Sequence, residues 1–223
     1  MLFSRELNYF FKYFYKNIVT CSEGQSPSPK FHSLESTVKN IHQELIDSCK
    51  TGDRDAQYEL YKLYFKAMYN TCLRIVNDTA EAEDIMQESF LDAFRNINNY
   101  TGQGTFGSWL KRIVINNSLD VLRKKKEMTS LEEAGFDPAD EMDGASESEI
   151  QYRVQEVKRA MQKLPEDSRI ILSLILFEGY DHEEVCEILN ISYNNSRTRF
   201  SRARQRLLDI IRESRLLGNM IYN

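Results

Sequence analysis

Residues 181–207 of the chain read DHEEVCEILNISYNNSRTRFSRARQRL. Asp181, with Glu184 three residues later, matches the capping-box pattern that begins a helix. This first helix is short, and its inward positions are Val185, Ile188 and Leu189. Ser192 is a candidate N-cap for a second helix. Two helices joined by a tight turn, with Ile191 filling the corner, predict a helix-turn-helix.

The second helix has two different faces. Its packing face is expected to carry Ser196, Phe200, Ala203, Leu207 and Ile210. The opposite, outward face carries Asn194, Arg197, Thr198 and Ser201. Arginines recur along the helix with no acidic residue before Asp209, namely Arg197, Arg199, Arg202, Arg204 and Arg206. Because arginine matches the geometry of guanine edges and phosphates, the outward face is predicted to read DNA; the alternative is a solvated arginine-rich face.

A buried helix is predicted before this motif. The sequence Leu164-Pro165-Glu166-Asp167 marks the end of one helix and the start of the next. The broad apolar face that follows ends at Gly179 and consists of Ile170, Ile171, Leu174, Ile175 and Phe177. Helical periodicity extends over residues 150–217, which are therefore expected to form a small domain.

A larger helical domain is expected at residues 41–126. Within it, Asp78 and Glu81 cap a helix whose inward stripe is Ile85, Met86, Ser89, Phe90, Ala93, Phe94 and Ile97. The outward side of this helix then carries Asp84, Gln87, Glu88 and Leu91. A partner protein can bury such a leucine while basic groups pair with its acidic rim, so a protein-contact surface is one interpretation. A solvated face is the alternative, and a carboxylate metal site finds no histidine and no matching motif here.

A glycine-rich loop with aromatic residues, YTGQGTF at residues 100–106, interrupts the helical pattern. The helix after it is expected to direct Leu110, Ile113, Val114, Val121 and Leu122 inward, and Trp109 is interpreted as a core residue. Arg112, Asn116 and Asn117 then lie beside the loop, and the helix ends in the basic run Arg123-Lys124-Lys125-Lys126. A loop that accepts an unstacked base, amides that bind its edge and a basic tail suit single-stranded DNA. A nucleotide-binding loop is not indicated, because Gly102-x-Gly104 lacks the G-K-[ST] ending.

The composition favours an all-α chain of two small helical domains. The 223 residues include only 9 glycines and 4 prolines, which indicates few turns. Residues 127–149 contain many acidic residues and no lysine or arginine, so they are expected to form a flexible acidic linker. The net charge of −5 argues against nonspecific coating of nucleic acid. The scattered cysteines and histidines form no metal or disulfide pattern, so no cofactor is expected and a reduced cytosolic setting fits.

Residues 1–40 form an extension of unassigned role. Its apolar residues fall at helical spacing, with Phe3, Leu7, Phe10, Phe11, Phe14 and Ile18 on one stripe, before Gly24, Pro27 and Pro29 break the pattern. It is interpreted as an extension without function, as a segment that docks on a partner or the core, or as a helix on a membrane surface. No segment supplies the ~18 uninterrupted apolar residues of a membrane span, and the extension lacks a secretory cleavage pattern, so no stable membrane insertion is expected.

Together these motifs resemble a family, the bacterial sigma factors of the small extracytoplasmic-function (ECF, group IV) class. Residues 84–90, DIMQESF, are similar to its region 2.2, residues 100–120 to regions 2.3 and 2.4, and residues 164–207 to region 4. The resemblance covers roughly residues 41–126 and 150–212. It implies a region 2 helical bundle and a region 4 helix-turn-helix in a non-catalytic, cytoplasmic subunit that binds core RNA polymerase and directs promoter-specific initiation.

The resemblance also implies roles for particular residues. Asp84, Gln87, Glu88 and Leu91 would bind the clamp helices of the polymerase β′ subunit, with the β flap as a further contact. The minus-ten element would meet Tyr100, Phe106, Arg112, Ile113, Asn116, Arg123 and Lys124. The minus-thirty-five element would meet Arg197, Thr198 and Ser201 at its bases and Asn195, Arg199 and Arg204 nearer its phosphates. The linker would pass toward the active-site and RNA-exit channels, and such factors are often held by an anti-sigma partner.

Two positions depart from the family's pattern. Tyr193-Asn194-Asn195-Ser196 replaces the usual small-Gly-Thr-Val opening, so the polar Ser196 stands where an apolar residue normally packs. His182 stands where the family usually has an aromatic residue. Two other function classes stay open. One is a stand-alone helix-turn-helix regulator that binds duplex DNA without polymerase, and the other is a nucleic-acid-processing enzyme that uses the carboxylates, for which no nucleophile, base and orienting group are evident.

Overall fold

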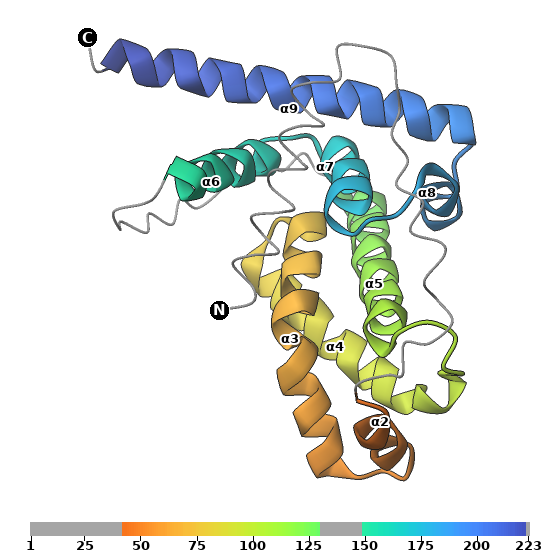
Figure 1. Cartoon of the computed structure of the whole chain (residues 1–223). Coiled ribbons are helices and arrows are strands. Elements are labelled where there is room, and N and C mark those ends of the chain that lie inside the picture. The colour runs from red at the N-terminus through yellow and green to blue at the C-terminus, as the bar shows by residue number, and fades with distance from the viewer. Residues whose placement is uncertain (1–41, 130–148, 222–223) are drawn as a thin grey trace. The chain divides into compact units, whose positions relative to one another are not determined.

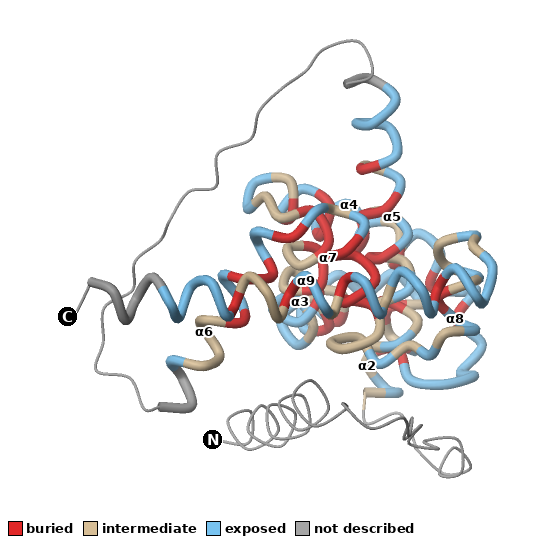
Figure 2. The backbone as a smooth tube through the Cα atoms, turned by 90° about the horizontal axis from the view of Figure 1, so that it is seen from above, coloured by how far each residue is buried: buried red, intermediate tan, exposed pale blue. Residues whose placement is uncertain are grey.

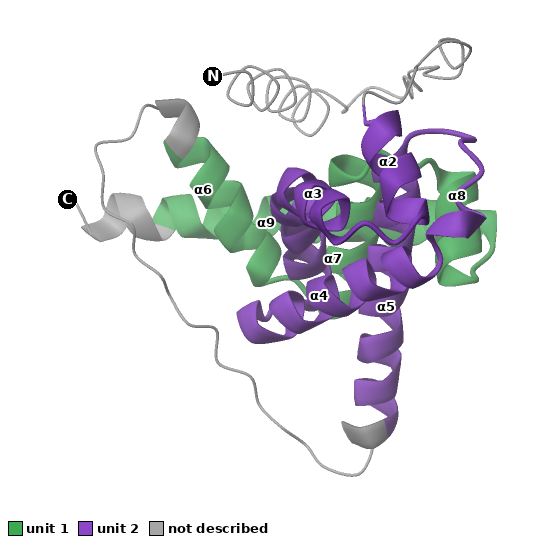
Figure 3. Ribbon diagram, turned by 90° about the horizontal axis from the view of Figure 1, so that it is seen from below, with its two compact units in different colours: residues 1–28, 136–223 green, residues 29–135 purple. Residues whose placement is uncertain are grey.

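The computed structural model describes residues 42–129 and 149–221 (Figure 1). Every regular element within these two ranges is helical, so the all-α expectation is confirmed. The chain divides into two compact units, which we call first and second in chain order (Figure 3). The described part of the first unit, purple and labelled unit 2 in the figure, is residues 42–129; that of the second, green and labelled unit 1, is residues 149–221.

The first unit is a small helical bundle. Its described elements are α2 (Gln43–Lys50), α3 (Arg54–Val76), α4 (Thr79–Arg95), the 3-10 turn η1 (Ile97–Asn99) and α5 (Phe106–Thr129). Helices α3, α4 and α5 pack against one another in all three pairings, and α2 packs on α3. The core is apolar and draws on every helix, with Ile46, Leu60, Ile75, Phe90, Leu110 and Val114 among its buried members (Figure 2).

Helix α4 begins after a turn of two residues, and that turn sets which of its faces meets α3 and α5. Asn77, in the left-handed conformation with φ 61°, ends α3 and donates its backbone N–H to Leu73 O over 2.9 Å. Asp78 then caps α4 by accepting a 2.9 Å hydrogen bond from Glu81 N, as the sequence predicted. The predicted inward stripe is confirmed, because Ile85, Met86, Ser89, Phe90, Ala93 and Ile97 are buried and Phe94 is partly buried.

The second unit is built around one long helix. Its described elements are α6 (Glu149–Gln162), α7 (Glu166–Leu172), the π-helical turn η2 (Ser173–Phe177), α8 (His182–Leu189) and α9 (Tyr193–Ile221). Helix α9 packs against α6, α7 and α8. Far from α8, Arg215 makes a two-pronged ion pair with the largely buried Glu156 of α6, at 2.6 and 2.7 Å.

The predicted helix-turn-helix is formed by α8 and α9. Asp181 accepts hydrogen bonds from Glu183 N and Glu184 N, and the Glu184 carboxylate returns to Asp181 N, which completes the capping box. Asn190, with φ 51°, ends α8, and Ser192 Oγ accepts a 3.4 Å hydrogen bond from Asn195 N at the start of α9. Both predicted caps are therefore present, and α8 and α9 are joined by a turn of three residues.

The helices extend beyond the domain limits that the sequence suggested. Helix α5 continues to Thr129, past the expected end at residue 126, and α9 continues to Ile221, past residue 217. The extension at residues 1–40 and residues 130–148 of the acidic linker lie outside the described residues. Among the described helices, none combines the length and the apolar run needed to cross a bilayer.

We expect Asp181→Ala to lower the free energy of unfolding of the second unit by about 1 kcal/mol, because the N-cap acceptor of α8 is lost. The single tryptophan, Trp109, lies in α5 of the first unit. Urea unfolding followed by circular dichroism should therefore register the loss, while unfolding followed by tryptophan fluorescence should not. Asp181→Asn keeps an N-cap acceptor and is the control; an equal loss in that variant would show that the charge, not the cap, stabilises α8.

Candidate nucleic-acid interfaces

Helix α9 presents the outward face that the sequence predicted. Ser196, Ala203 and Leu207 are fully or almost fully buried on one side. The opposite side is exposed and hollowed into a shallow, open depression lined by Asn194, Arg197, Thr198, Ser201 and Arg202. Because the packing face is fixed by burial, the polar face is held toward solvent, where a DNA groove could meet it.

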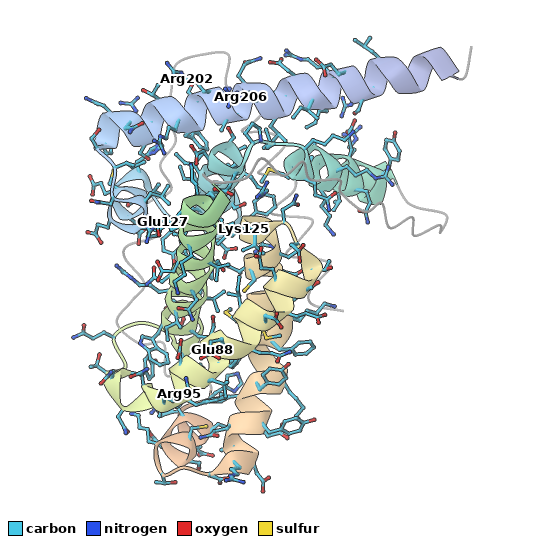
Figure 4. All side chains as sticks on the ribbon, turned by 180° about the vertical axis from the view of Figure 1, so that it is seen from behind. Glu88, Arg95, Lys125, Glu127, Arg202 and Arg206 are labelled. Carbon is cyan, nitrogen blue, oxygen red and sulfur yellow. The ribbon has the colours of Figure 1, made fainter. Side chains whose placement is uncertain are left out.

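The arginines of α9 are not equivalent. Arg197 is exposed and makes no hydrogen bond or ion pair with any described residue. Arg199 Nε donates to Asn195 Oδ1 over 3.0 Å, which holds this pair along the helix surface. Arg206 Nη1 donates to Ser168 Oγ of α7 over 3.2 Å and so takes part in packing within the unit (Figure 4). The positive stripe seen in the sequence is therefore divided between a free outward part and a structural part.

The two departures from the family pattern contact each other. His182 Nδ1, at the start of α8, lies 2.9 Å from Ser196 Oγ on the buried face of α9, a hydrogen bond whose donor depends on the ring tautomer. The imidazole also packs edge-on against Tyr193 and Phe200, with ring centroids 5.9 and 5.6 Å apart. Burial lowers the pKa of His182 from its ordinary value, nearby Arg197 lowers it further, and Asp181 opposes both. Sequence reasoning noted each residue separately and missed the contact, which joins positions 14 residues apart.

The glycine-rich loop of the first unit differs from the expectation. Tyr100 and Phe106 were predicted to meet DNA, but their side chains are only 3% and 1% exposed. Their rings pack edge-on at 5.6 Å, and each also contacts Trp109, while Tyr64 of α3 packs on Phe106. The Tyr100 hydroxyl donates to Gly104 O over 2.9 Å and closes the loop on itself. Burying these large rings in the core is more favourable than exposing them, so Tyr100 and Phe106 are not exposed to solvent as expected of base contacts, and their contact with DNA stays a prediction.

The polar tip of that loop, residues 101–105, is exposed and is backed by the aromatic cluster of Tyr100, Phe106 and Trp109. Gly102 and Gly104 both adopt φ +81°, a conformation that glycine enters without strain and that permits the tight reversal. The aromatic cluster therefore supports a small, exposed polar platform at the N-terminal end of α5.

The first turns of α5 carry the amide and basic residues expected beside this loop. Arg112 and Asn116, one helical turn apart, are exposed, and Ile113 is half-buried. Asn117 does not share their face: its Nδ2 donates to Ser89 Oγ over 3.2 Å and to Asp92 Oδ2 over 3.1 Å. This side chain joins α5 to α4, so Asn117 does not lie beside the loop with Arg112 and Asn116 as the sequence suggested.

The C-terminal end of α5 is basic and exposed. Arg123 and Lys124 both lie on the surface, and Arg123 Nη1 is 2.9 Å from Asp120 Oδ1 in an exposed pair that contributes little to stability. Lys125 instead turns to α4, where its Nζ lies 3.3 Å from Glu81 Oε1. Arg112, Asn116, Arg123 and Lys124 thus offer hydrogen-bond donors along α5 from the loop to its end.

The outward face of α4 has the predicted exposure. Asp84, Gln87 and Glu88 are all exposed, and Leu91 among them is 49% exposed. Glu88 Oε1 accepts a 3.1 Å hydrogen bond from Arg95, two turns further along the helix, and Arg95 also pairs with Asp92 at 3.3 Å (Figure 4). No group of three metal-ligating side chains occurs among the described residues. An exposed leucine inside an acidic and amide rim is a surface suited to a partner protein.

Comparison with known families gives matches in both units. Residues 60–127 match Sigma-70 region 2, and residues 154–207 match Sigma-70, region 4. The first match contains the outward face of α4, the loop and α5 up to Glu127. The second contains the helix-turn-helix with the depression on α9.

Curated relatives give the same result. The chain is 30% identical over 173 residues to the RNA polymerase sigma-H factor of Pseudomonas aeruginosa, covering 73% of this chain and 90% of that protein. It is 30% identical over 181 residues to the ECF RNA polymerase sigma factor SigW of Bacillus subtilis, covering 75% of this chain and 95% of that one. In fold, it is similar to the sigma factor RpoE solved with the anti-sigma factor NepR from Bartonella quintana, with a TM-score of 0.54 and 21% identity over 70% of this chain and 96% of that one.

The adjacent asparagines of α5 allow a matched test of structural and exposed roles. Asn117→Ala should lower the free energy of unfolding of the first unit by about 1–2 kcal/mol, because it removes the hydrogen bonds to Ser89 and Asp92. Asn116→Ala, at an exposed position, should leave stability unchanged. Urea unfolding followed by Trp109 fluorescence measures both, and equal stability of the two variants would contradict the assignment.

Proposed function

Since the chain belongs to the extracytoplasmic-function class of sigma factors, which bind core RNA polymerase and direct promoter-specific transcription initiation, we propose that its two units each recognise one element of the same promoter. The first unit would take the minus-ten element and the second the minus-thirty-five element. The observation that carries this proposal is the exposed, polar and basic face of α9, held outward by a buried opposite face.

In the second unit, Arg197, Thr198 and Ser201 would contact base edges in the major groove. All three line the exposed depression on α9, and the Arg197 guanidinium makes no hydrogen bond or ion pair with another described residue. Asn195, Arg199 and Arg204 would lie nearer the phosphates. The hydrogen bond between Asn195 and Arg199 supports this division, because it holds the guanidinium along the helix rather than toward the groove.

In the first unit, the exposed loop tip at residues 101–105, with Arg112, Ile113 and Asn116, would receive a base turned out of the duplex. Arg123 and Lys124 would hold the neighbouring phosphates. The exposure of Asn116 supports a contact between its amide and a base edge, and the half-buried Ile113 offers apolar area beside it. Tyr100 and Phe106 would support this site from beneath.

The exposed face of α4 would bind the clamp helices of the polymerase β′ subunit through Asp84, Gln87, Glu88 and Leu91, while the second unit would contact the β flap. A partner's basic groups would compete with Arg95 for Glu88, which is an exchange of one exposed ion pair for another. Leu91 would then supply the apolar area that the contact buries.

The proposed function also implies a cellular location, a domain organisation and an inhibitory partner. We place it in the cytoplasm, where transcription occurs, without catalytic activity of its own. The four domains suggested by the sequence, at residues 1–40, 41–126, 127–149 and 150–217, are retained as the proposed organisation. An inhibitory partner of the anti-sigma type is also proposed, because the related RpoE structure contains one.

The test of the proposed function is in vitro transcription with purified core RNA polymerase over promoters randomised at both elements. The proposed function predicts defined start sites and enrichment of two separated motifs. A stand-alone regulator would instead bind duplex DNA tightly without polymerase, and an enzyme would show metal-dependent turnover of the nucleic acid. Either result, without start-site selection, contradicts the proposal.

Charge reversal on α4 tests the polymerase contact. Gln87→Lys and Glu88→Lys should each weaken binding to core polymerase by about 10-fold or more, because they place a positive charge against basic partner groups. Glu44→Lys, at an exposed position of α2, carries the matched control charge. Fluorescence anisotropy of the labelled full chain measures the affinity, and circular dichroism checks folding. Unchanged affinity in both α4 variants, as in the control, would remove the α4 face from the interface.

Replacement of Arg197 tests the reading of the minus-thirty-five element. Arg197→Ala should cost about 1–3 kcal/mol at one base position, as expected for a bidentate contact to guanine. Arg212→Ala, on the same helix and paired with Asp209, is the control and should leave the base preference unchanged. Transcription from single-base promoter variants measures both. An equal loss on every sequence would reassign Arg197 to a phosphate.

A further inference from the structure

We propose that His182 and Ser196 form a positioning pair that fixes the rotation of α9 against α8, and thereby determines where Arg197 and Thr198 meet the minus-thirty-five bases. The proposal rests on the proposed function of α9 and adds residues that do not themselves touch DNA. Its basis is a polar contact between the two helices of the helix-turn-helix, made by a side chain that is buried on α9.

Ser196 needs a polar partner at its position. The residue is 0% exposed and lies on the same side of α9 as the buried Ala203 and Leu207. A hydroxyl buried without a hydrogen bond costs about 1–3 kcal/mol, so the 2.9 Å contact with His182 Nδ1 is needed to keep this face packed. An apolar contact tolerates sliding and rotation, whereas a hydrogen bond fixes the distance and direction between two atoms.

The imidazole is itself held in place. It packs edge-on against Tyr193 and Phe200, which lie on the first turns of α9 before and after Ser196. Thus α9 contacts the ring at three positions near its start, two through aromatic edges and one through the hydroxyl. His182 immediately follows the N-cap Asp181, so the capping box of α8 anchors the other end of the contact.

The positioning pair is adjacent to the residues that would read DNA. Arg197 follows Ser196 directly in the chain, and successive residues of a helix are separated by 100° around the axis. A small rotation of α9 that breaks the contact between His182 and Ser196 therefore carries Arg197 and Thr198 around the axis by the same angle. Side chains reading a base edge need sub-ångström placement, so the buried contact controls the exposed one.

Charges around the ring favour the neutral form of His182. Burial lowers the pKa of His182, Arg197 on α9 lowers it further, and the aromatic ring of Tyr193 packs against the imidazole. On α8, the carboxylate of Asp181 acts in the opposite direction. The folded protein therefore binds a proton at His182 more weakly than the unfolded chain does. As a result, the second unit loses stability as the pH falls from 6.5, the ordinary pKa of histidine, to the lower pKa that His182 has in the folded protein.

A double-mutant cycle tests the positioning pair. The full chain is combined with core polymerase and selected against promoters randomised at the minus-thirty-five element, as wild type, His182→Phe, Ser196→Val and the double variant. Each single change should reduce the ratio of best to wrong base by about 10-fold, because it leaves one buried polar group without its partner. The double variant, which restores an apolar contact, should recover most of the loss. His42→Phe, a matched change at the N-cap position of α2 in the first unit, should have no effect.

Two further measurements separate positioning from general stability. His182→Asn keeps an amide nitrogen or oxygen near the place of Nδ1 and should retain more base preference than His182→Phe. If His182→Phe fails to fold, His182→Asn is compared with the wild type instead. The wild-type preference should also decline as pH falls below 6.5, and the double variant should lack this dependence.

The outcomes distinguish the two proposals. If wild type selects a minus-thirty-five motif but the single variants keep the same base ratios, or the double variant shows the sum of their losses, the positioning role is overturned. If wild type shows start-site selection without any preference at this element, the proposed function of α9 itself is overturned. In that case thermal unfolding of the same four proteins would still report whether the two side chains are coupled.

Discussion

The burial of one side of α9 is the constraint on which the second unit depends. Ser196, Ala203 and Leu207 are removed from solvent against the helices that α9 crosses, so this side of the helix cannot turn to solvent without exposing apolar area. The face opposite them is consequently exposed from Asn194 to Arg202. The same rule operates on α4 in the first unit, where the buried stripe through Ile85, Ser89 and Phe90 leaves Leu91 in solvent. In both units the surface proposed to bind a partner is therefore the side of the helix opposite its buried, packed side.

The starts of the helices and the faces they bury could be predicted from the sequence, because helical periodicity and caps are local signals. Asp78, Asp181 and Ser192 begin helices where their side-chain chemistry indicated, and the faces of α4 and α9 follow from residue spacing alone. What the sequence could not indicate depends on contacts between distant positions. The sequence pattern of an aromatic residue in a glycine-rich loop is the same whether the ring stacks on a base or closes the loop. Tyr100 and Phe106 are buried because they pack against Tyr64 and Trp109, which is a tertiary contact.

The same limit applies to the polar residues. Asn116 and Asn117 are chemically identical neighbours, yet one is exposed and the other bonds to side chains 25 and 28 residues away. The arginines of α9 form a single run in the sequence, but Arg206 is held by Ser168 and Arg199 by Asn195. Local charge density in a chain of net charge −5 therefore overstates how much of α9 is available to a nucleic acid. Helical spacing predicts on which side of the helix a residue lies, but only the structure shows which side chains it contacts there.

The closed loop between Tyr100 and Gly104 has a thermodynamic consequence for any ligand that reaches the first unit. A flexible loop of this length would lose backbone conformational entropy on association, at about 1–2 kcal/mol for each residue that becomes ordered. Here the hydroxyl of Tyr100 and the surrounding rings restrict the loop during folding, before a ligand arrives. Association then begins from a loop whose shape is already restricted, so less conformational entropy is lost on binding and the affinity is higher.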